Sequence, residues 1–419
     1  MKIRIKDYLF IVRRGDRHLK EIIKKLFDEV RVAYESEENQ RRQNLWKFKN
    51  NKKKESFAPG ILTPYSCLDN KFERIPVTIE LERPTWANLL KFSLDDYYSD
   101  YLIRIKSELE IALYRFKTFQ DDTPISKTIS LWMSVGFEPS FFGANLIFSK
   151  NDEPKVSVEP IIKEIRDLDY LKLPNFFESG LMPVAHRMYE NIKSMLPEDF
   201  NIEFPEWGRG PFGIAVALRG MNNILIDCYD QPEFVHSLMQ FIIESEKEWS
   251  IAKAKFLKCE VGKTALYNDE VSLPIISPLI YEEFIESYER KITHFHNGVT
   301  WWHSCGKKSS LLPMINRIGD IELFDAGLWV DDIEEVVNNF KSGSSLIVRF
   351  HPLSVFYDNK EPNVLSSKLN FISNVCKKLP FYFRADGIQF IHGQVEDMLK
   401  IKQWLSAVIL WARNSNIRN

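Results

Sequence analysis

The chain has 419 residues, 44% of them hydrophobic, and a formal net charge of −2. It can therefore bury one large core, and its charge does not indicate a nucleic acid or an acidic membrane surface as partner. Its five cysteines do not form a disulfide framework, its N-terminus lacks the apolar region of a signal peptide, and no apolar run reaches the ~18 residues that span a bilayer. We expect a globular cytoplasmic protein with no membrane or nucleic-acid partner.

The N-terminal part is predicted to be a helical arm. Residues 15–48 show helical spacing of apolar side chains: Leu19, Ile22, Ile23, Leu26, Phe27, Val30 and Val32. The basic, Asn-rich run 47–54 follows, and a solvated linker is favoured there over a site for an anionic partner. We therefore expect an arm and basic linker over residues 1–60 and one barrel domain over 61–419.

Strands and helices are then predicted to alternate. Strands are expected at 77–81, 128–135, 201–204, 263–267, 299–303, 321–326, 346–350 and 381–385, and helices at 95–119, 159–167, 180–195, 231–257, 277–296, 307–317, 330–340, 365–378 and 395–405. Pro232 and Ser277 suit a first helical turn and an N-cap. This alternation is typical of βαβ units, and their number favours a (β/α)8 TIM-type barrel over an open sheet.

Polar residues at the predicted strand ends indicate where chemistry would take place, because the active groups of such barrels lie at the C-terminal ends of the strands. These residues are Glu206 and Arg209, Asp269 and Glu270, His303 and Cys305, Asp325, His351, and Arg384 with Asp386. Each has a structural alternative, such as capping a loop or pairing with its neighbour.

The stretch His303-Ser304-Cys305-Gly306 indicates a metal site. Two residues apart on an extended segment, the imidazole and the thiol point the same way, and zinc prefers nitrogen and sulfur ligands. The alternative is a buried cysteine beside a histidine that bonds only to backbone. A carboxylate from the pair Asp269 and Glu270 would complete three ligands and leave the fourth position open, as in catalytic zinc sites.

Other motifs do not compete with this interpretation. Cys228 and Cys259 lie in apolar helical patterns and Cys376 lies within a predicted helix, so none is expected to be a ligand. The sequence has no Gly-x-Gly-x-x-Gly after a strand, no phosphate-binding Gly-Lys-Ser/Thr loop and no Gly-x-Ser-x-Gly elbow.

These residues resemble the uroporphyrinogen decarboxylase superfamily, which includes zinc-dependent, corrinoid-linked methyltransferases. The resemblance is strongest over residues 200–310, extends from 80 to 405, and is absent from the first 60 residues. The segments that carry it are Gly210-Pro211-Phe212-Gly213, Asp230-Gln231-Pro232-Glu233-Phe234-Val235, Ser277-Pro278 and, most specifically, His303-Ser304-Cys305-Gly306. It implies a (β/α)8 barrel with its site at the strand C-termini.

Two departures from the family refine the expected activity. Decarboxylase members carry an Arg-containing loop near the N-terminus, whereas here Arg83-Pro84-Thr85-Trp86 continues as Ala87-Asn88-Leu89-Leu90, which disfavours porphyrinogen decarboxylation. Thiol-methylating members have a third ligand, a cysteine, just after the last strand, where this chain has Ile388. Either a carboxylate, Glu270 or Asp269, completes the zinc site or no metal binds. We favour the carboxylate and expect Glu270 to be the third zinc ligand beside His303 and Cys305, with Asp269 next to it.

The resemblance implies a zinc-dependent methyltransferase. It would move a methyl group between a small methylated substrate (methyl ether, methylamine or thiol) and a cobamide on a separate corrinoid carrier protein, because no cobamide-binding motif is visible in this chain. The expected catalytic residues are Asp269, Glu206, His351, Arg384 and Asp386. A homodimer is the candidate assembly. The alternatives are a metal-free lyase, in which Arg384 and Arg209 hold a carboxylate, and a non-catalytic barrel.

Overall fold

The computed structural model describes residues 16–47, 63–64, 69, 73–149, 151–325, 327, 333–339, 344–350, 355, 362–388 and 395–415. The strands are β1 Trp46–Lys47, β2 Thr63–Pro64, β3 Val77–Leu81, β4 Thr128–Ser130, β5 Leu146–Ser149, β6 Asp152–Val156, β7 Asn201–Glu203, β8 Thr264–Tyr267, β9 Val299–His303, β10 Leu323–Asp325, β11 Ser345–Phe350 and β12 Phe381–Ile388. The α-helices are α1 Asp16–Glu35, α2 Glu37–Gln43, α3 Arg83–Leu90, α4 Leu94–Ser99, α5 Tyr101–Tyr114, α6 Phe137–Phe141, α7 Met182–Met195, α8 Pro211–Arg219, α9 Met221–Asp230, α10 Pro232–Leu257, α11 Pro278–Ile280, α12 Ser287–Phe295, α13 Leu312–Ile315, α14 Ile333–Asn339, α16 Pro362–Cys376 and α17 Val395–Asn414.

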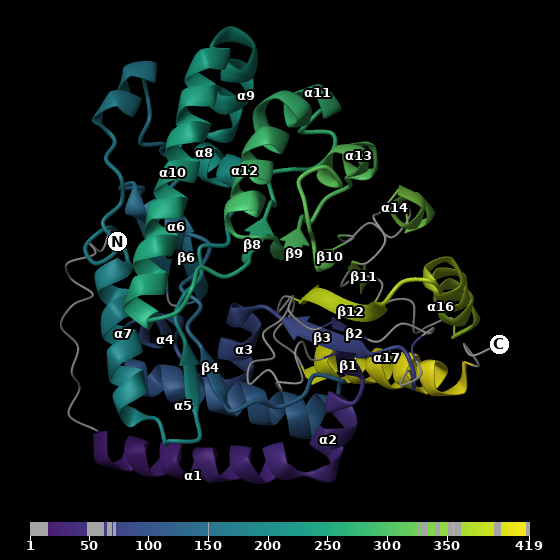
Figure 1. Ribbon diagram of the computed structural model, residues 1–419. Helices are drawn as coiled ribbons and strands as arrows, with labels where there is room; N and C mark the ends of the chain where they lie inside the picture. Colours follow the sequence, from purple (N-terminus) through teal and green to yellow (C-terminus); the bar gives the residue numbers. More distant parts are fainter. Residues whose placement is uncertain are drawn as a thin grey trace.

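A parallel sheet forms the centre of the molecule (Figure 1). Six strands run in the order β3-β12-β11-β10-β9-β8, and β4 and β7 form a separate parallel pair. The segment after β7 joins this pair to the sheet, because Tyr267 of β8 donates its N–H to Gly208 O (2.7 Å) and accepts from Gly210 N (3.0 Å). Strand β7 thus leads directly to the edge of β8.

At the opposite edge of the sheet, two buried aspartates that precede β4 in the sequence form hydrogen bonds with β3. The backbone N–H of Asp122 donates to Val77 O (2.9 Å), and the carboxylate of Asp122 accepts from Val77 N (2.8 Å). Asp121 accepts from the backbone N–H of Ile79 (3.0 Å). Eight strands therefore follow one another around the predicted (β/α)8 barrel, which confirms the expected fold class.

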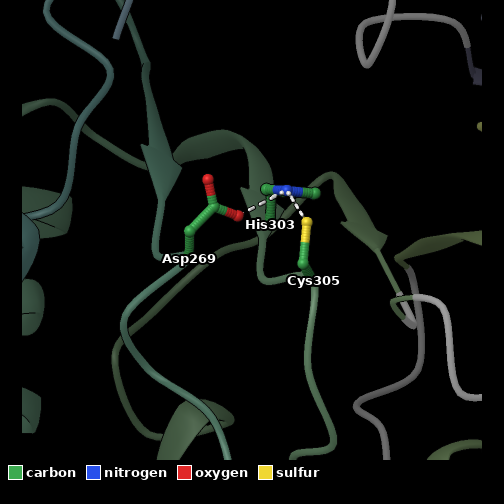
Figure 2. A group of neighbouring side chains, drawn as sticks. All are labelled: Asp269, His303 and Cys305. Atoms are coloured by element: carbon green, nitrogen blue, oxygen red, sulfur yellow. Dashed lines mark hydrogen bonds and ion pairs between the residues drawn. The ribbon is translucent and has the colours of Figure 1, made fainter. Parts of the chain in front are cut away.

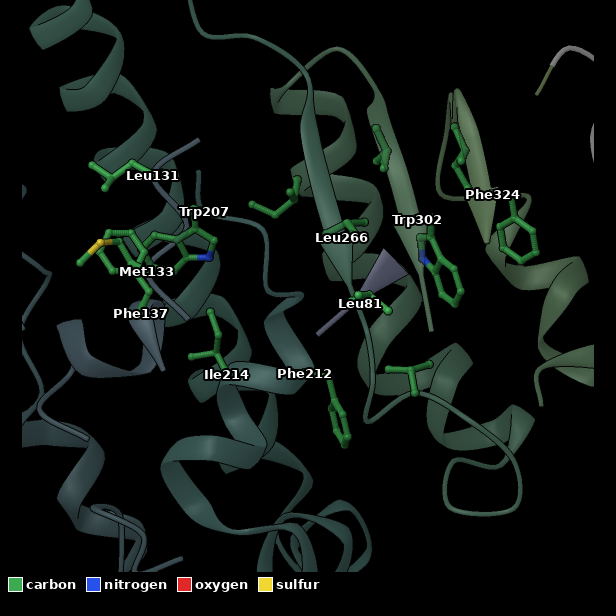
Figure 3. Packing of buried hydrophobic residues seen from close by; sticks show 14 of the residues in the cluster. Leu81, Leu131, Met133, Phe137, Trp207, Phe212, Ile214, Leu266, Trp302 and Phe324 are labelled. Atoms are coloured by element: carbon green, nitrogen blue, oxygen red, sulfur yellow. The ribbon is translucent and has the colours of Figure 1, made fainter. Parts of the chain in front are cut away.

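The two faces of the strands serve different purposes. Leu266, Trp302 and Phe324, from three neighbouring strands, belong to the main hydrophobic core (Figure 3), and the rings of Trp302 and Phe324 stack with centroids 5.3 Å apart. Because strand side chains alternate, Trp301 and His303 face the opposite way, into the barrel. One strand therefore supplies both core packing and a site residue.

The N-terminal arm packs against its own chain. Helix α1 lies along α5 (Figure 1), and Arg31 forms an ion pair with Asp199 (2.8 Å). Beyond α2, the buried Trp46 packs its ring 5.1 Å from that of Tyr382 inside the barrel and donates its indole N–H to Asp122 O (2.9 Å). The division of the chain at residue 60 stays a prediction, but Trp46 contributes directly to the barrel interior.

Most predicted elements are present with shifted ends, and several differ, among them residues 95–119, which divide at the extended Asp100 into α4 and α5. Residues 15–48 divide at Ser36, whose extended backbone and hydroxyl cap α2, and Val32 is 74% exposed. Residues 159–167 contain only the start of a 3-10 helix, Ile165–Tyr170, because the extended backbone of Glu164 ends any helix before it. The strand expected at 128–135 ends at Ser130, and residues 307–317 hold a 3-10 turn and the short α13. None of the described helices is long and apolar enough to cross a membrane.

Candidate metal centre

The ends of β8 and β9 bring Asp269 next to His303. Tyr267 pairs with His303 in the parallel ladder, and the N–H of Asn268 then donates to His303 O (2.8 Å). This bond carries the pairing one residue beyond β8, so that Asp269 leaves the sheet beside the imidazole. A contact between residues 34 positions apart thus follows from the register of two strands.

The corner after β9 places Cys305 on the same side. Ser304 donates its hydroxyl to Val271 O (2.8 Å), which anchors the corner to the segment after β8. Gly306 packs so closely that a Cβ there would lie 2.3 Å from Cβ of Ser272. The glycine of the predicted motif is therefore required by a close approach of two loops.

Asp269, His303 and Cys305 form a compact cluster (Figure 2). Nε2 of His303 lies 3.0 Å from Oδ1 of Asp269 and 3.3 Å from Sγ of Cys305. One potential ligand atom from each residue lies within 4.8 Å of the others. No other group of three such side chains occurs in the part of the chain that the structure describes. The close approach of His303 and Cys305 matches the spacing argument from the sequence.

Carboxylates on both sides of the ring determine the charge of His303. Its Nδ1 lies 2.7 Å from Oδ2 of the fully buried Asp325. Burial disfavours the imidazolium, but Asp325 and Asp269 outweigh it and hold the pKa of His303 well above its usual value. Burial likewise opposes the charged forms of Asp269 and Asp325, yet nearby positive charge, from His303 and for Asp325 also Arg349, lowers both pKa values.

A second layer of buried charges lies behind the cluster. Nη1 of Arg349 lies 3.7 Å from Sγ of Cys305 and 3.4 Å from Oδ2 of Asp325, and Nη2 lies 2.7 Å from Oδ2 of Asp386. Arg384 reaches the same oxygen of Asp386 with Nε (3.1 Å). The structure therefore brings the predicted pair Arg384 and Asp386 together and connects it to Cys305 through Arg349. Sequence reasoning missed Arg349, although it lies on the inward face of β11.

Glu270 does not occupy the place expected for the third ligand. Its carboxylate is paired with the guanidinium of Arg209, and burial raises its pKa. Asp269, expected to lie beside the metal, is instead the carboxylate that contacts His303. We therefore replace Glu270 by Asp269 in the candidate ligand set.

Glu206 does not belong to the described cluster. Glu206 is largely exposed and forms an ion pair with Lys253 of α10. It lines a separate cavity of about 240 Å³ together with Tyr267 and Trp301. His351 lies outside the described residues.

The other cysteines are poor ligand candidates. Cys228 and Cys376 are buried, and burial raises the pKa of each thiol to about 12. Cys259 is exposed and follows the end of α10, which corrects its expected place in an apolar helical pattern. Cys67 lies outside the described residues.

The cluster fits a zinc ion. It offers one nitrogen, one sulfur and one oxygen donor, the set that zinc accepts in proteins. The ring nitrogen of His303 that faces away from the cluster is held by Asp325, as is usual for metal-bound histidine. The side chain of Asp269 is 44% exposed, so the cluster is accessible from solvent.

Two cavities lie near the C-terminal ends of the strands. One, of about 1040 Å³, is lined by Glu82 and Thr85, which follow β3, by Trp132, which follows β4, and by residues of the β5–β6 hairpin. The other, of about 600 Å³, is lined by Arg209 and Glu270 together with apolar side chains. Neither cavity is lined by Asp269, His303 or Cys305, so both lie beside the cluster.

Comparisons with known proteins agree with this architecture. The family model described as uroporphyrinogen decarboxylase (URO-D) matches residues 128–374. Among solved structures, the fold is similar to that of a methyltransferase from Methanosarcina mazei, with a TM-score of 0.58 and 14% sequence identity over 80% of this chain and 93% of that chain. A comparison with curated proteins finds no match. The structural likeness, at this identity, concerns the fold.

Proposed function

The chain belongs to the uroporphyrinogen decarboxylase family, and from that premise we propose that it is a zinc-dependent, corrinoid-linked methyltransferase. It would move a methyl group between a small methyl ether, methylamine or thiol and a cobamide held by a carrier protein. In the demethylating direction the carbon–heteroatom bond of the substrate would break with its electron pair staying on the heteroatom, and the reduced cobamide of the carrier would supply the acceptor for the methyl group. The observation that carries this proposal is the cluster of Asp269, His303 and Cys305.

In the proposed site, Asp269 takes the role of the third ligand, for which thiol-methylating members of the family use a cysteine at the position of Ile388. Ile388 is buried, and its carbonyl oxygen accepts bonds from the hydroxyl of Thr85 (2.9 Å) and the N–H of Glu82 (3.3 Å). This position therefore serves the packing of β12 against α3. A carboxylate at the end of β8 supplies the third donor atom from another strand.

Each polar residue near the cluster has a proposed task. Asp325 accepts the Nδ1 proton of His303, which leaves Nε2 facing Cys305 and Asp269. Arg349 forms ion pairs with Asp325 and Asp386 and so fixes both carboxylates. Arg384 forms an ion pair with Asp386, and its guanidinium carbon lies 5.7 Å from the centroid of the Trp301 ring. Bound zinc would supply Lewis acidity toward an oxygen or sulfur atom in its open position.

The two alternative functions have less support. A metal-free lyase would need the charges of Arg209 and Arg384 for a substrate carboxylate, but these guanidinium groups already pair with Glu270 and Asp386. A non-catalytic barrel would have its strand-end face filled, whereas cavities of about 1040 and 600 Å³ lie there. The first observation disfavours the lyase, and the second disfavours the non-catalytic barrel.

The first test is the metal content of the purified protein beside a Cys305→Ser variant. We expect about one zinc ion per chain in the wild type and loss of zinc in the variant, with an unchanged circular dichroism spectrum. Methylated ethers, amines and thiols are then assayed with cob(I)alamin as acceptor, and formation of methylcobalamin is followed by absorbance.

Cys305→Ser should abolish the transfer. A variant that keeps a full complement of zinc would show that Cys305 is not a ligand. A wild type that holds no zinc, under conditions that do not strip metals, would contradict the zinc-dependent mechanism.

A further inference from the structure

A buried carboxylate on the outer side of the sheet binds the ends of β8 and β9. Glu289 of α12 is fully buried and accepts three hydrogen bonds. Asn268 donates with Nδ2 to Oε1 (2.8 Å), and Tyr281 OH (2.8 Å) and Trp302 Nε1 (3.2 Å) both donate to Oε2. Asn268 Nδ2 and Trp302 Nε1 can only donate, whereas the Tyr281 hydroxyl can donate or accept, and burial raises the pKa of Glu289 to about 7.

Two of these donors directly precede proposed metal ligands. Asn268 precedes Asp269, and Trp302 precedes His303. Along β9 successive side chains point to opposite faces, so the direction of Trp302 determines that of His303. The backbone bond from Asn268 N to His303 O then couples the two strand ends. Glu289 thus restrains both ends without touching either ligand.

We propose that Glu289 is a positioning residue that sets the separation and orientation of Asp269 and His303. This inference rests on the proposed zinc site. Loss of the carboxylate would leave the buried donors of Asn268 and Trp302 without an acceptor, and both side chains would have to move to find one. Because outer-layer partners of metal ligands commonly change affinity by about 10- to 100-fold, even a small displacement of two ligands should be measurable.

The test compares Glu289→Gln with Tyr281→Phe. Glu289→Gln keeps one carbonyl oxygen and replaces the other by an amide donor, so either the bond to Asn268 or the bond to Trp302 is lost. Tyr281→Phe removes one hydrogen bond to the same carboxylate but leaves the bonds to Asn268 and Trp302 in place. Zinc affinity is measured by chelator competition, and cobalt(II) in place of zinc reports ligand geometry through its visible spectrum.

We expect Glu289→Gln to weaken zinc binding by about 10- to 100-fold and to change the cobalt(II) spectrum. Tyr281→Phe should lower thermal stability while keeping wild-type zinc affinity and spectrum. A purely structural role for Glu289 predicts that both variants are less stable and that neither changes zinc affinity. If Glu289→Gln does not fold, Trp302→Phe serves instead, because it keeps a smaller aromatic ring against Phe324 and removes the donor to Glu289.

The outcomes separate this inference from the proposed function. If the wild type binds zinc, Cys305→Ser loses it and Glu289→Gln binds it as the wild type does, the positioning role is wrong and the metal site stands. If the wild type binds neither zinc nor cobalt(II), the metal site itself is wrong, and the role proposed for Glu289 is overturned with it.

Discussion

Oδ2 of Asp325 lies 2.7 Å from Nδ1 of His303, while Oδ1 of the same carboxylate accepts the backbone N–H of Gly327 (2.9 Å). Both oxygens of Asp325 are thus held, and the carboxylate can fix the orientation of the imidazole. An Asp325→Asn variant loses the negative acceptor for Nδ1–H. We expect its zinc affinity to fall by about 10- to 100-fold in chelator competition.

Asp386→Asn is the matched control for this prediction. Asp386 carries the same charge and contacts Arg349 and Arg384 rather than His303. It should therefore change zinc affinity less than Asp325→Asn does. Equal effects of the two variants would indicate that total charge, rather than the bond to His303, governs metal binding.

Asp269 and Glu270 are adjacent in the sequence but have different tasks, so their amide variants should behave differently. Asp269→Asn removes a proposed ligand and should abolish stoichiometric zinc in elemental analysis. Glu270→Gln should keep zinc but lower the free energy of unfolding by about 1–3 kcal/mol, because Arg209 loses its charged partner. The reverse pattern would restore Glu270 as the ligand.

In the metal-free protein, the contribution of His303 to stability should fall as the pH rises. The stabilisation that zinc binding produces should instead increase with pH. In the metal-free protein the pKa of His303 is raised, so its contribution to stability is complete below about pH 6.5 and is lost as the pH rises through the folded-state pKa. Zinc requires a neutral imidazole and a thiolate, so zinc affinity should increase with pH.

Melting temperatures at constant free zinc, measured from about pH 6 to 9, test this prediction. The stabilisation produced by zinc should grow with pH, while the metal-free protein loses the contribution of His303. In a His303→Gln variant both effects should disappear. A zinc-induced shift that is independent of pH would argue against His303 as a ligand.

Gly306→Ala should disturb the cluster through packing alone. The new Cβ would lie 2.3 Å from Cβ of Ser272, so the corner that carries Cys305 must move. We expect a loss of about 1–3 kcal/mol in the free energy of unfolding, by urea titration, together with weaker zinc binding. Gly262→Ala is the control, because nothing lies within 4 Å of the added Cβ. The double variant Gly306→Ala with Ser272→Gly should recover part of both losses.

Trp46→Ala tests how far the N-terminal arm belongs to the barrel. The Trp46 ring is buried against Tyr382, so its removal should cost about 3–5 kcal/mol of unfolding free energy. Val32→Ala, on the exposed side of α1, should change stability by less than about 0.5 kcal/mol. A small effect of Trp46→Ala would support an independent arm over residues 1–60.

Local patterns in the sequence were sufficient to predict the fold class and the approach of two candidate ligands. The alternation of strand and helix predicted the barrel, since apolar periodicity is a property of a few neighbouring residues. The spacing of His303 and Cys305 predicted that they approach each other, because it depends only on an extended backbone and the corner after β9.

Only the tertiary structure chose between Asp269 and Glu270. Both follow β8, and the directions of their side chains depend on partners distant in the sequence. Glu270 forms an ion pair with Arg209, whereas the hydrogen bond from Asn268 N to His303 O brings Asp269 beside the imidazole. Arg349 is visible in the sequence as a charged residue within the otherwise uncharged strand Ser345–Phe350, but its partners are not. Its role depends on pairing with Asp325 and Asp386 of the two neighbouring strands, which is a matter of register between segments that no local pattern contains.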